Sequence, residues 1–561
     1  MLFKIIKFKL ITLLLYQSPL YSKSTSFNDF NSKDLTKYFS GIIAFQNKDN
    51  STALKFFNSS KVLFNRHDPY LKRYVYSLVL DNKVSQAINI IKNNKNKNNS
   101  NFFDAYLLLT LDSFKKKDFE KANFYLNKIS SLYQLDRFNL AILESLKEYN
   151  HVFKEKRILN NKKNLGKLSI ISETFQRCYL KDKTTDIYFS NLINDDEADY
   201  TRYVYFYLSY LIENNRLEDA LKITKNLDYI KTTLLLSQAK SWIRNGNLKK
   251  LTNVFSCKNS NDILAEFLFL ISNLHSAQDN FEKSNFYLSL SSFLNPKFLF
   301  NLSLVVENQF LNGEYKKAKK TLKKFEKEDS FYHWYRVKKE AQIIEKQRNK
   351  KESLNYISAE FDKIDNPNDK ILFDIANFYK NSQKYEEAIE YYTIIIKSLN
   401  DASEIKSDLL YRRGGSYERI GKYEKADEDL LNALNINPED AYILNYLAYS
   451  WLERDYKINK AIEMLEKAYS FKSDDPYIID SIGWAYYLVN DHIKAEKFLK
   501  RAVELMPDDP IVNDHYGDIL WKLDRKIQAR YFWRNVLEMD DAEEEMIENI
   551  NIKMIKGLKN S

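Results

Sequence analysis

Glycine and proline are scarce in this chain of 561 residues. It contains 10 glycines and 8 prolines, far below the usual shares of about 7% and 5%. Sandwiches and barrels of β-strands need a turn after every strand, so this composition argues against an all-β fold and favours a helical one. The chain is also too long for one compact domain, which indicates a repetitive or multidomain protein.

Sequence patterns of common catalytic sites are also missing. The glycines form neither G-x-x-x-x-G-K nor G-x-G-x-x-G, and the six histidines include no H-E-x-x-H. Ser416 lacks the glycine that a nucleophile elbow needs two residues after its serine. We therefore expect no enzyme activity and no cofactor. An atypical hydrolase within residues 130–200 is the enzymatic alternative.

The few cysteines and histidines leave two questions open. Cys178 and Cys257 are far apart in sequence, and nothing in the sequence decides whether they form a disulfide. They are also too widely separated for a zinc ribbon. His492 and His515 each adjoin an aspartate and could hold a metal, but exposed or hydrogen-bonded histidines are commoner, so we expect no metal site.

Residues 1–24 have the order of a secretory signal peptide. Three lysines precede the apolar stretch 10–16, and a polar segment ending at Ser24 follows. The apolar stretch is far shorter than the ~20 residues of a membrane-spanning helix, and no later run is long enough either. We predict cleavage near residues 22–24, a mature chain without a transmembrane segment, and a location in the periplasm or cell envelope. An amphipathic or buried first helix is the alternative.

Charge is distributed unevenly along the sequence. Residues 401–561 contain 23 Lys and Arg against 32 Asp and Glu, a net charge of −9, so residues 1–400 carry a net charge of +19. Basic runs such as Lys316–Lys324 would suit a polyanion, although solvated helix faces produce similar runs. Binding of a nucleic acid or another polyanion through the basic first half is therefore the alternative function.

A repeat of about 34–38 residues runs through most of the chain. Small residues begin short amphipathic stretches at this interval, and a second small residue often lies about twelve positions before the first. Two facing small residues allow the two helices of a hairpin to approach closely, and prolines after the second helix end it. The residues with these roles in the second half are Ala388, Gly414, Ala426, Pro438, Ala448, Ala461, Gly483, Ala495, Pro507, Gly517 and Ala529.

The stretches DLLYRRGGSYERIGKYEKADEDLLNALNINPED and DSIGWAYYLVNDHIKAEKFLKRAVELMPDDP show this pattern most clearly. They resemble tetratricopeptide repeats, most specifically from about 370 to 540. The stretch PIVNDHYGDILWKLDRKIQARYFWRNVLEMD resembles exported repeat proteins of Gram-negative bacteria. The resemblance implies an all-α, right-handed superhelical solenoid of stacked antiparallel helix pairs, with a concave groove lined by the first helix of each pair.

The strength of the repeat divides the chain into segments. In order, we expect a signal peptide at 1–24, degenerate repeats at 25–130, an irregular helical segment at 131–200, degenerate repeats at 201–368, a clear repeat array at 369–540 and a capping helix at 541–561. The last segment has acidic residues at its start and lysines at its end, which suits the dipole of a helix.

Register within the repeat predicts which side chains face the groove. Residues one and four places after the small residue of a first helix should point into the concavity, and Tyr411 lies three places before the small residue Gly414. The candidate partner-binding residues are Tyr411, Tyr449, Trp484, Tyr487, Asp518 and Trp521. Aromatics with scattered carboxylates suit the apolar, proline or basic groups of a peptide. The leading hypothesis is a non-enzymatic scaffold of the bacterial envelope that binds a protein or peptide; alternatively, these aromatics fill the interior of the superhelix.

Overall fold

The computed structural model of the chain is helical wherever it is described. It describes residues 32–65, 67–94, 97–132, 135–160, 163–194, 201–226, 232–325, 330–399, 404–539 and 542–558. None of these residues lies in a β-strand, which confirms the predicted all-α class. No helix in these ranges has the length and apolar character needed to span a bilayer. The predicted signal peptide, 1–24, lies outside the described residues.

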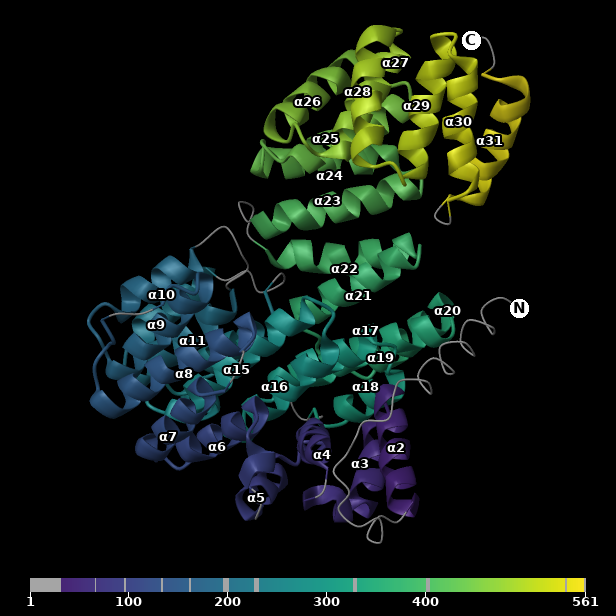
Figure 1. The fold of residues 1–561 in the computed structure, drawn as a ribbon. Helices are drawn as coiled ribbons and strands as arrows, with labels where there is room; N and C mark the ends of the chain where they lie inside the picture. Colours follow the sequence, from purple (N-terminus) through teal and green to yellow (C-terminus); the bar gives the residue numbers. More distant parts are fainter. Residues whose placement is uncertain are drawn as a thin grey trace. The chain divides into compact units, whose positions relative to one another are not determined.

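Two compact units make up the chain (Figure 1). Unit 1 consists of residues 1–225 and 235–325, and unit 2 consists of residues 226–234 and 326–561. In unit 2, consecutive helices pack in pairs and the pairs stack on one another, as expected for a helical solenoid. Most neighbouring helices of unit 1 also pack on one another, but α11 (Thr201–Glu213) packs on α14 (Leu248–Val254). The finer boundaries at 130, 200, 368 and 540 stay predictions.

The described helices of unit 1 run from Ser32 to Leu322. Its helices are α2 (Ser32–Gln46), α3 (Asn50–Ser59), η2 (Lys61–Asn65), α4 (Asp68–Leu80), α5 (Val84–Asn93), η3 (Lys97–Ser100), α6 (Phe103–Lys115), α7 (Phe119–Ser130), α8 (Arg137–Glu155), α9 (Lys167–Leu180), α10 (Thr185–Ile193), α11 (Thr201–Glu213), α12 (Leu217–Asn226), α13 (Leu234–Arg244), α14 (Leu248–Val254), α15 (Ser260–Ser276), α16 (Phe281–Leu294), α17 (Asn301–Leu311) and α18 (Tyr315–Leu322).

Helices near the start of unit 1 pack against helices near its end. Helices α4 and α5 pack on α16, and α6 packs on α15 (Figure 1). Tyr76 of α4 stacks on Phe286 of α16 with ring centroids 4.7 Å apart. Nζ of Lys48 donates to Oδ1 of Asn312 at 2.5 Å. Unit 1 is therefore stabilised by contacts between distant repeats as well as by neighbour stacking, which the repeat pattern alone does not predict.

A disulfide joins Cys178 of α9 to Cys257, which lies between α14 and α15, with Cα atoms 5.6 Å apart. The sequence left this pairing open because it depends on how distant helices stack. Both cysteines are buried, at 1% exposure each. The bond therefore ties α9 to a later part of unit 1.

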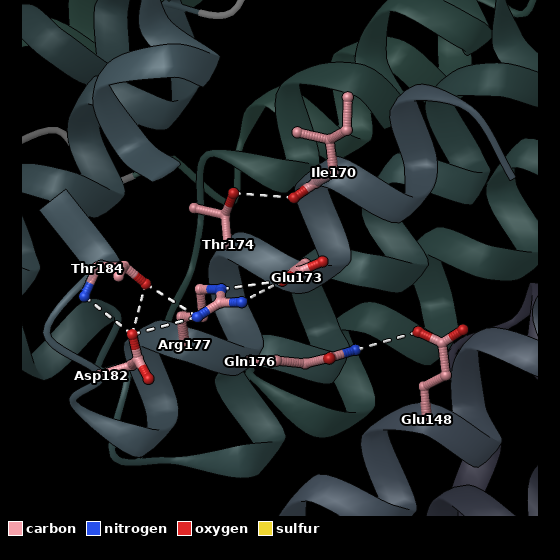
Figure 2. A network of polar contacts seen from close by, with 8 residues as sticks. All are labelled: Glu148, Ile170, Glu173, Thr174, Gln176, Arg177, Asp182 and Thr184. Carbon is pink, nitrogen blue, oxygen red and sulfur yellow. Dashed lines mark hydrogen bonds and ion pairs between the residues drawn. The ribbon is translucent and has the colours of Figure 1, made fainter. Parts of the chain in front are cut away.

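Polar contacts hold α9 in place next to this disulfide (Figure 2). Arg177 bonds to Glu173 at 2.6 Å, to Oδ1 of Asp182 at 3.2 Å and to Oγ1 of Thr184 at 2.9 Å. Hydrogen bonds from Thr184 hold the pKa of Asp182 below its usual value. The network therefore fixes the turn between α9 and α10.

Unit 2 is a stack of six helix pairs followed by one further helix. Its helices are α19 (Ser330–Gln347), α20 (Lys350–Phe361), α21 (Asp369–Asn381), α22 (Tyr385–Ser398), α23 (Glu404–Arg419), α24 (Tyr423–Ile436), α25 (Ala441–Glu453), α26 (Ile458–Phe471), α27 (Pro476–Leu488), α28 (His492–Leu505), α29 (Pro510–Lys522), α30 (Lys526–Leu537) and α31 (Glu544–Lys556). In each pair from α19/α20 to α29/α30, the odd-numbered helix is called the first helix.

Glycines mark the closest approaches within these pairs. A Cβ added to Gly517 of α29 would lie 2.4 Å from Nε1 of Trp533 on α30, and one added to Gly483 of α27 would lie 2.7 Å from Cγ of Leu499 on α28. Both Trp533 and Leu499 are fully buried. The large residue of the second helix therefore packs directly on the glycine backbone of the first.

Aspartates and prolines set the ends of these helices. The side chains of Asp440, Asp475 and Asp509 accept backbone N–H groups at the N-termini of α25, α27 and α29. Pro438 follows α24 and Pro507 follows α28, where no helix can continue. The first helices thus begin at equivalent positions, which keeps their side chains in register.

Helix α31 closes unit 2 by packing on α30. Ile550 is fully buried, and Met546, Met554 and Leu558 pack against the core of this unit. Glu544 and Glu545 lie in the first turn, and Lys553 and Lys556 lie in the last, as favoured by the helix dipole.

Candidate functional site

The candidate binding residues come from consecutive first helices of unit 2. Tyr411 lies on α23, Tyr449 on α25, Trp484 and Tyr487 on α27, and Asp518 and Trp521 on α29. Helix α25 contacts α27, and α27 contacts α29. Four of the six residues belong to one group that we call the acidic aromatic cluster. Its members are Tyr449, Glu453, Asp480, Trp484, Tyr487, Asp514, His515 and Asp518.

Stacked rings form the centre of this cluster. The ring of Trp484 stacks on Tyr487 with centroids 4.6 Å apart and on His515 with centroids 4.1 Å apart. Trp484 and Tyr487 are half-buried, whereas His515 is buried. The indole therefore links α27 to α29 and keeps part of its surface available to another molecule.

Asp480 and His515 form a buried pair beneath this stack. Oδ2 of Asp480 lies 2.8 Å from Nδ1 of His515, and the two residues are 4% and 6% exposed. Burial alone would lower the pKa of His515, but the charge and hydrogen bond of Asp480 outweigh it, and the pKa is raised. The histidine thus binds an aspartate of the preceding pair instead of its sequence neighbour Asp514.

Carboxylates surround the two tyrosines of the cluster. Burial, followed by the charges of Glu453 and Asp480, raises the pKa of Tyr449. Burial, followed by the charges of Asp518 and Asp514, raises the pKa of Tyr487. Both phenols therefore stay protonated at physiological pH and sit in a negative potential.

The chain's own Lys553, on α31, lies against the end of the cluster. Its ammonium bonds to Oδ1 of Asp514 at 2.6 Å and to both oxygens of Asp518 at 2.8 and 2.9 Å. Nε1 of Trp533 also donates to Asp518 at 3.0 Å. Burial, followed by the charge of Asp514, nevertheless raises the pKa of Asp518 to about 6.

Trp521 and Tyr411 lie outside this cluster. Trp521 packs on Trp533 with ring centroids 5.3 Å apart, and Gly557 is so close that an added Cβ would lie 1.9 Å from Cζ2 of the indole. Gly557, after α31, thus lies against Trp521, which is half-buried. Tyr411 packs edge-on against Tyr446 of α25 at 5.5 Å. Their roles in binding stay predictions.

Sequence reasoning gave Asp480 and Lys553 no role in binding, and it considered His515 beside Asp514 only as a possible metal site. Asp480 and Asp514 lie three positions before Gly483 and Gly517, as Tyr411 does before Gly414, so the register could have identified them. No spacing rule relates Lys553 to Asp518, since α31 is not part of the clear repeat.

Unit 1 contains a pocket of about 470 Å³ between its first helices and α16–α18. The basic run Lys316–Lys324 contributes Lys317, Lys320 and Lys324 to its lining, together with Glu282 and Glu314. Lys317 bonds to Glu314 at 3.0 Å. This wall is therefore of mixed charge, unlike the uniformly basic surface that a polyanion site requires.

A family model described as "Tetratricopeptide repeat" matches residues 369–393 and 407–440, which fall on α21 to α24. Helices α21 to α24 therefore belong to tetratricopeptide repeats. Arrays of such repeats are scaffolds for protein interaction, and unit 2 has the stacked pairs that this role requires. No curated protein matches the sequence significantly.

Several solved tetratricopeptide-repeat structures resemble part of the chain. MamA 41-end from Desulfovibrio magneticus RS-1 is 19% identical over 31% of this chain and 97% of its own, with a TM-score of 0.27. A thermophilic repeat protein from Thermus thermophilus, TTC0263, is 16% identical over 34% of this chain and all of its own, with a TM-score of 0.30. PilW, a type IV pilus biogenesis factor, is 19% identical over 34% of this chain and 85% of its own, with a TM-score of 0.30. These scores are too low to support any further argument.

Proposed function

We propose that this protein is a non-enzymatic scaffold of the bacterial cell envelope, and that it binds a protein or peptide on the first-helix side of unit 2. The acidic aromatic cluster is the observation that carries the proposal. It places Tyr449, Trp484 and Tyr487 on adjacent first helices, half-buried and close to carboxylates.

Half-buried aromatic rings are well suited to anchor a partner. Tryptophan and tyrosine contribute a large share of the binding energy in many interfaces because they bury much apolar area at a low cost in side-chain entropy. Trp484 is already held by its stacks on Tyr487 and His515. A partner that covers its remaining surface would therefore find it pre-oriented.

The disulfide supports the location in the envelope. Bonds of this kind persist in oxidising compartments such as the bacterial periplasm and are rare in the cytosol. Cys178 and Cys257 pair within unit 1, and the signal-like segment at residues 1–24 provides an independent reason to expect export.

In-cell cross-linking of the tagged full chain, followed by identification of the captured protein, tests the proposal. The Trp484→Ala variant should lose the captured partner. Tyr531→Ala is the matched control, because Tyr531 is 60% exposed on α30, a second helix, outside the cluster. Capture that is equally strong with both variants would place the binding surface elsewhere and contradict the proposal.

Polyanion binding through the basic first half is the second candidate function, and it is supported by the net charge of +19 over residues 1–400. It predicts binding that falls steeply with salt and does not depend on the sequence of a nucleic acid. Binding to one protein that survives moderate salt would instead favour the scaffold.

A further inference from the structure

We propose that the acidic aromatic cluster receives a basic side chain of the partner, an arginine or a lysine, beside Asp480 and Tyr449. This inference rests on the proposed function, since it names the chemistry by which the first-helix side of unit 2 recognises its peptide. Three independent features of the cluster support it: an unused acceptor, an internal lysine on the equivalent carboxylate of the next helix pair, and an excess of negative charge.

The unused acceptor is Oδ1 of Asp480. Oδ2 of this carboxylate bonds to His515, but Oδ1 is buried and accepts no hydrogen bond from any residue that the structure describes. Oδ1 of Asn445, at the equivalent position of α25, is also buried without a described donor. A buried acceptor without a donor costs free energy, so a donor supplied by a ligand would be favoured at this place.

The internal precedent is Lys553. Its ammonium bonds to Asp514 and Asp518 on α29, one helix pair further along the stack, and lies 6.0 Å from the ring centre of Trp533. Asp514 occupies the same repeat position as Asp480, three residues before the glycine of its helix. The chain itself thus places a lysine on the carboxylate that is equivalent to Asp480.

Negative charge is in excess in the cluster. Glu453, Asp480, Asp514 and Asp518 contribute four carboxylates, whereas the cations bonded to them among the described residues are Lys553 and, when protonated, His515. Helices α25 and α27 contain no lysine or arginine. The raised pKa of Asp518 is consistent with this imbalance.

The aromatic rings favour a cation over a neutral donor. A guanidinium or ammonium over the face of a tryptophan or tyrosine gains from the ring quadrupole as well as from nearby carboxylates. Tyr449 and Trp484 provide such rings at equivalent positions of α25 and α27. An acidic partner side chain would be repelled at the same place.

Peptide libraries with one defined residue test this inference on the full chain. The probes are fluorescein-labelled 12-residue peptides, randomised except for a central arginine, lysine, citrulline or glutamate, and binding is read as fluorescence anisotropy. Citrulline keeps the shape of arginine without its charge. We expect the arginine and lysine libraries to bind at least about 10-fold more tightly than the citrulline library, since hydrogen bonds between charged groups are stronger than those to a neutral donor. The glutamate library should bind most weakly.

Two variants locate the effect within unit 2. Glu453→Gln and Asp480→Asn should each reduce the preference for a basic residue to less than about 3-fold, because each removes one charge from the cluster. Glu463→Gln is the control. It removes one negative charge from α26, the helix paired with α25, and should leave the preference for a basic residue unchanged. If Asp480→Asn disturbs the fold, Glu453→Gln decides the question, because Glu453 is exposed.

The outcomes separate this inference from the proposed function. If all four libraries bind alike, or Glu453→Gln keeps the full preference, the basic-residue site is wrong while a scaffold that captures its partner in cells stands. If the libraries do not bind but the cross-linked partner does, the cluster is likewise not a site for a basic side chain. Absence of both peptide binding and partner capture would overturn the proposed function together with this inference.

Discussion

His515 and Asp518 bind a proton more tightly in the folded chain than in an unfolded one. Asp480 raises the pKa of His515 despite burial, whereas burial and Asp514 raise the pKa of Asp518 to about 6. A group with a raised pKa stabilises the fold fully below its unfolded value, and this contribution is lost as the pH rises through the folded value. In an unfolded chain, the pKa of aspartate is about 3.9 and that of histidine is about 6.5.

The stability of unit 2 should therefore fall as the pH rises through about 4 to 6, because of Asp518, and again above about 6.5, because of His515. We expect Asp518→Asn to flatten the profile of stability against pH between about 4 and 6. His515→Gln should flatten the same profile above about 6.5, because each variant removes one of the two titrations. Thermal unfolding followed by tryptophan fluorescence across this pH range is the measurement. Unchanged pH profiles in both variants would show that neither residue titrates as described.

Trp484 and Trp521 differ in what covers them, so their truncation should have different costs. Trp521 lies under Gly557 and against Trp533, and Trp521→Ala should lower the free energy of unfolding by about 3–5 kcal/mol. Trp484→Ala mainly loses two ring stacks and should cost about 1–2 kcal/mol. Urea unfolding measures both values. Equal large losses would mean that Trp484 belongs to the core and is not available to a partner.

Within the helix pairs, the close contact between glycine and a large residue is the main determinant of packing. Gly517→Ala would push a methyl group into Trp533 and should destabilise unit 2 by about 1–3 kcal/mol. Gly415→Ala is the control within the same kind of helix: its Cβ would lie 3.3 Å from the phenolic oxygen of Tyr446, which can move. Alanine favours helix by up to about 1 kcal/mol over glycine, so Gly415→Ala should be neutral or stabilising. Urea unfolding should rank the two variants in this order, and the reverse order would exclude Gly517 as a packing determinant.

The elements that could be predicted from sequence are those defined by local or periodic chemistry. Gly483 and Gly517 predicted the close helix contacts. The spacing of the repeat predicted that Tyr449 and Trp484 lie on one side of adjacent first helices. The contacts that escaped prediction all pair residues that no fixed spacing relates. Cys178 with Cys257, Tyr76 with Phe286, and Lys553 with Asp518 depend on how the stack curves and ends, which is a property of summed packing rather than of any one repeat.

The two units should respond differently to loss of the disulfide. Both cysteines of the sequence lie in unit 1, and a disulfide that closes a loop of this length stabilises a fold by about 2–4 kcal/mol. Five of the six tryptophans, Trp334, Trp451, Trp484, Trp521 and Trp533, lie in unit 2, whereas Trp242 lies in unit 1. Tryptophan fluorescence therefore reports mainly on unit 2, and far-ultraviolet circular dichroism reports on the helices of both.

Reduction, or the double variant Cys178→Ser with Cys257→Ser, should lower the temperature of one thermal transition seen by circular dichroism. The transition seen by tryptophan fluorescence should stay where it is, because stacked repeats gain stability from near neighbours and unit 2 has no cysteine. Adding reductant to the double variant is the control and should change neither signal. If the fluorescence transition falls together with the circular dichroism transition, the chain unfolds as one cooperative block, and the division into two units does not describe its stability.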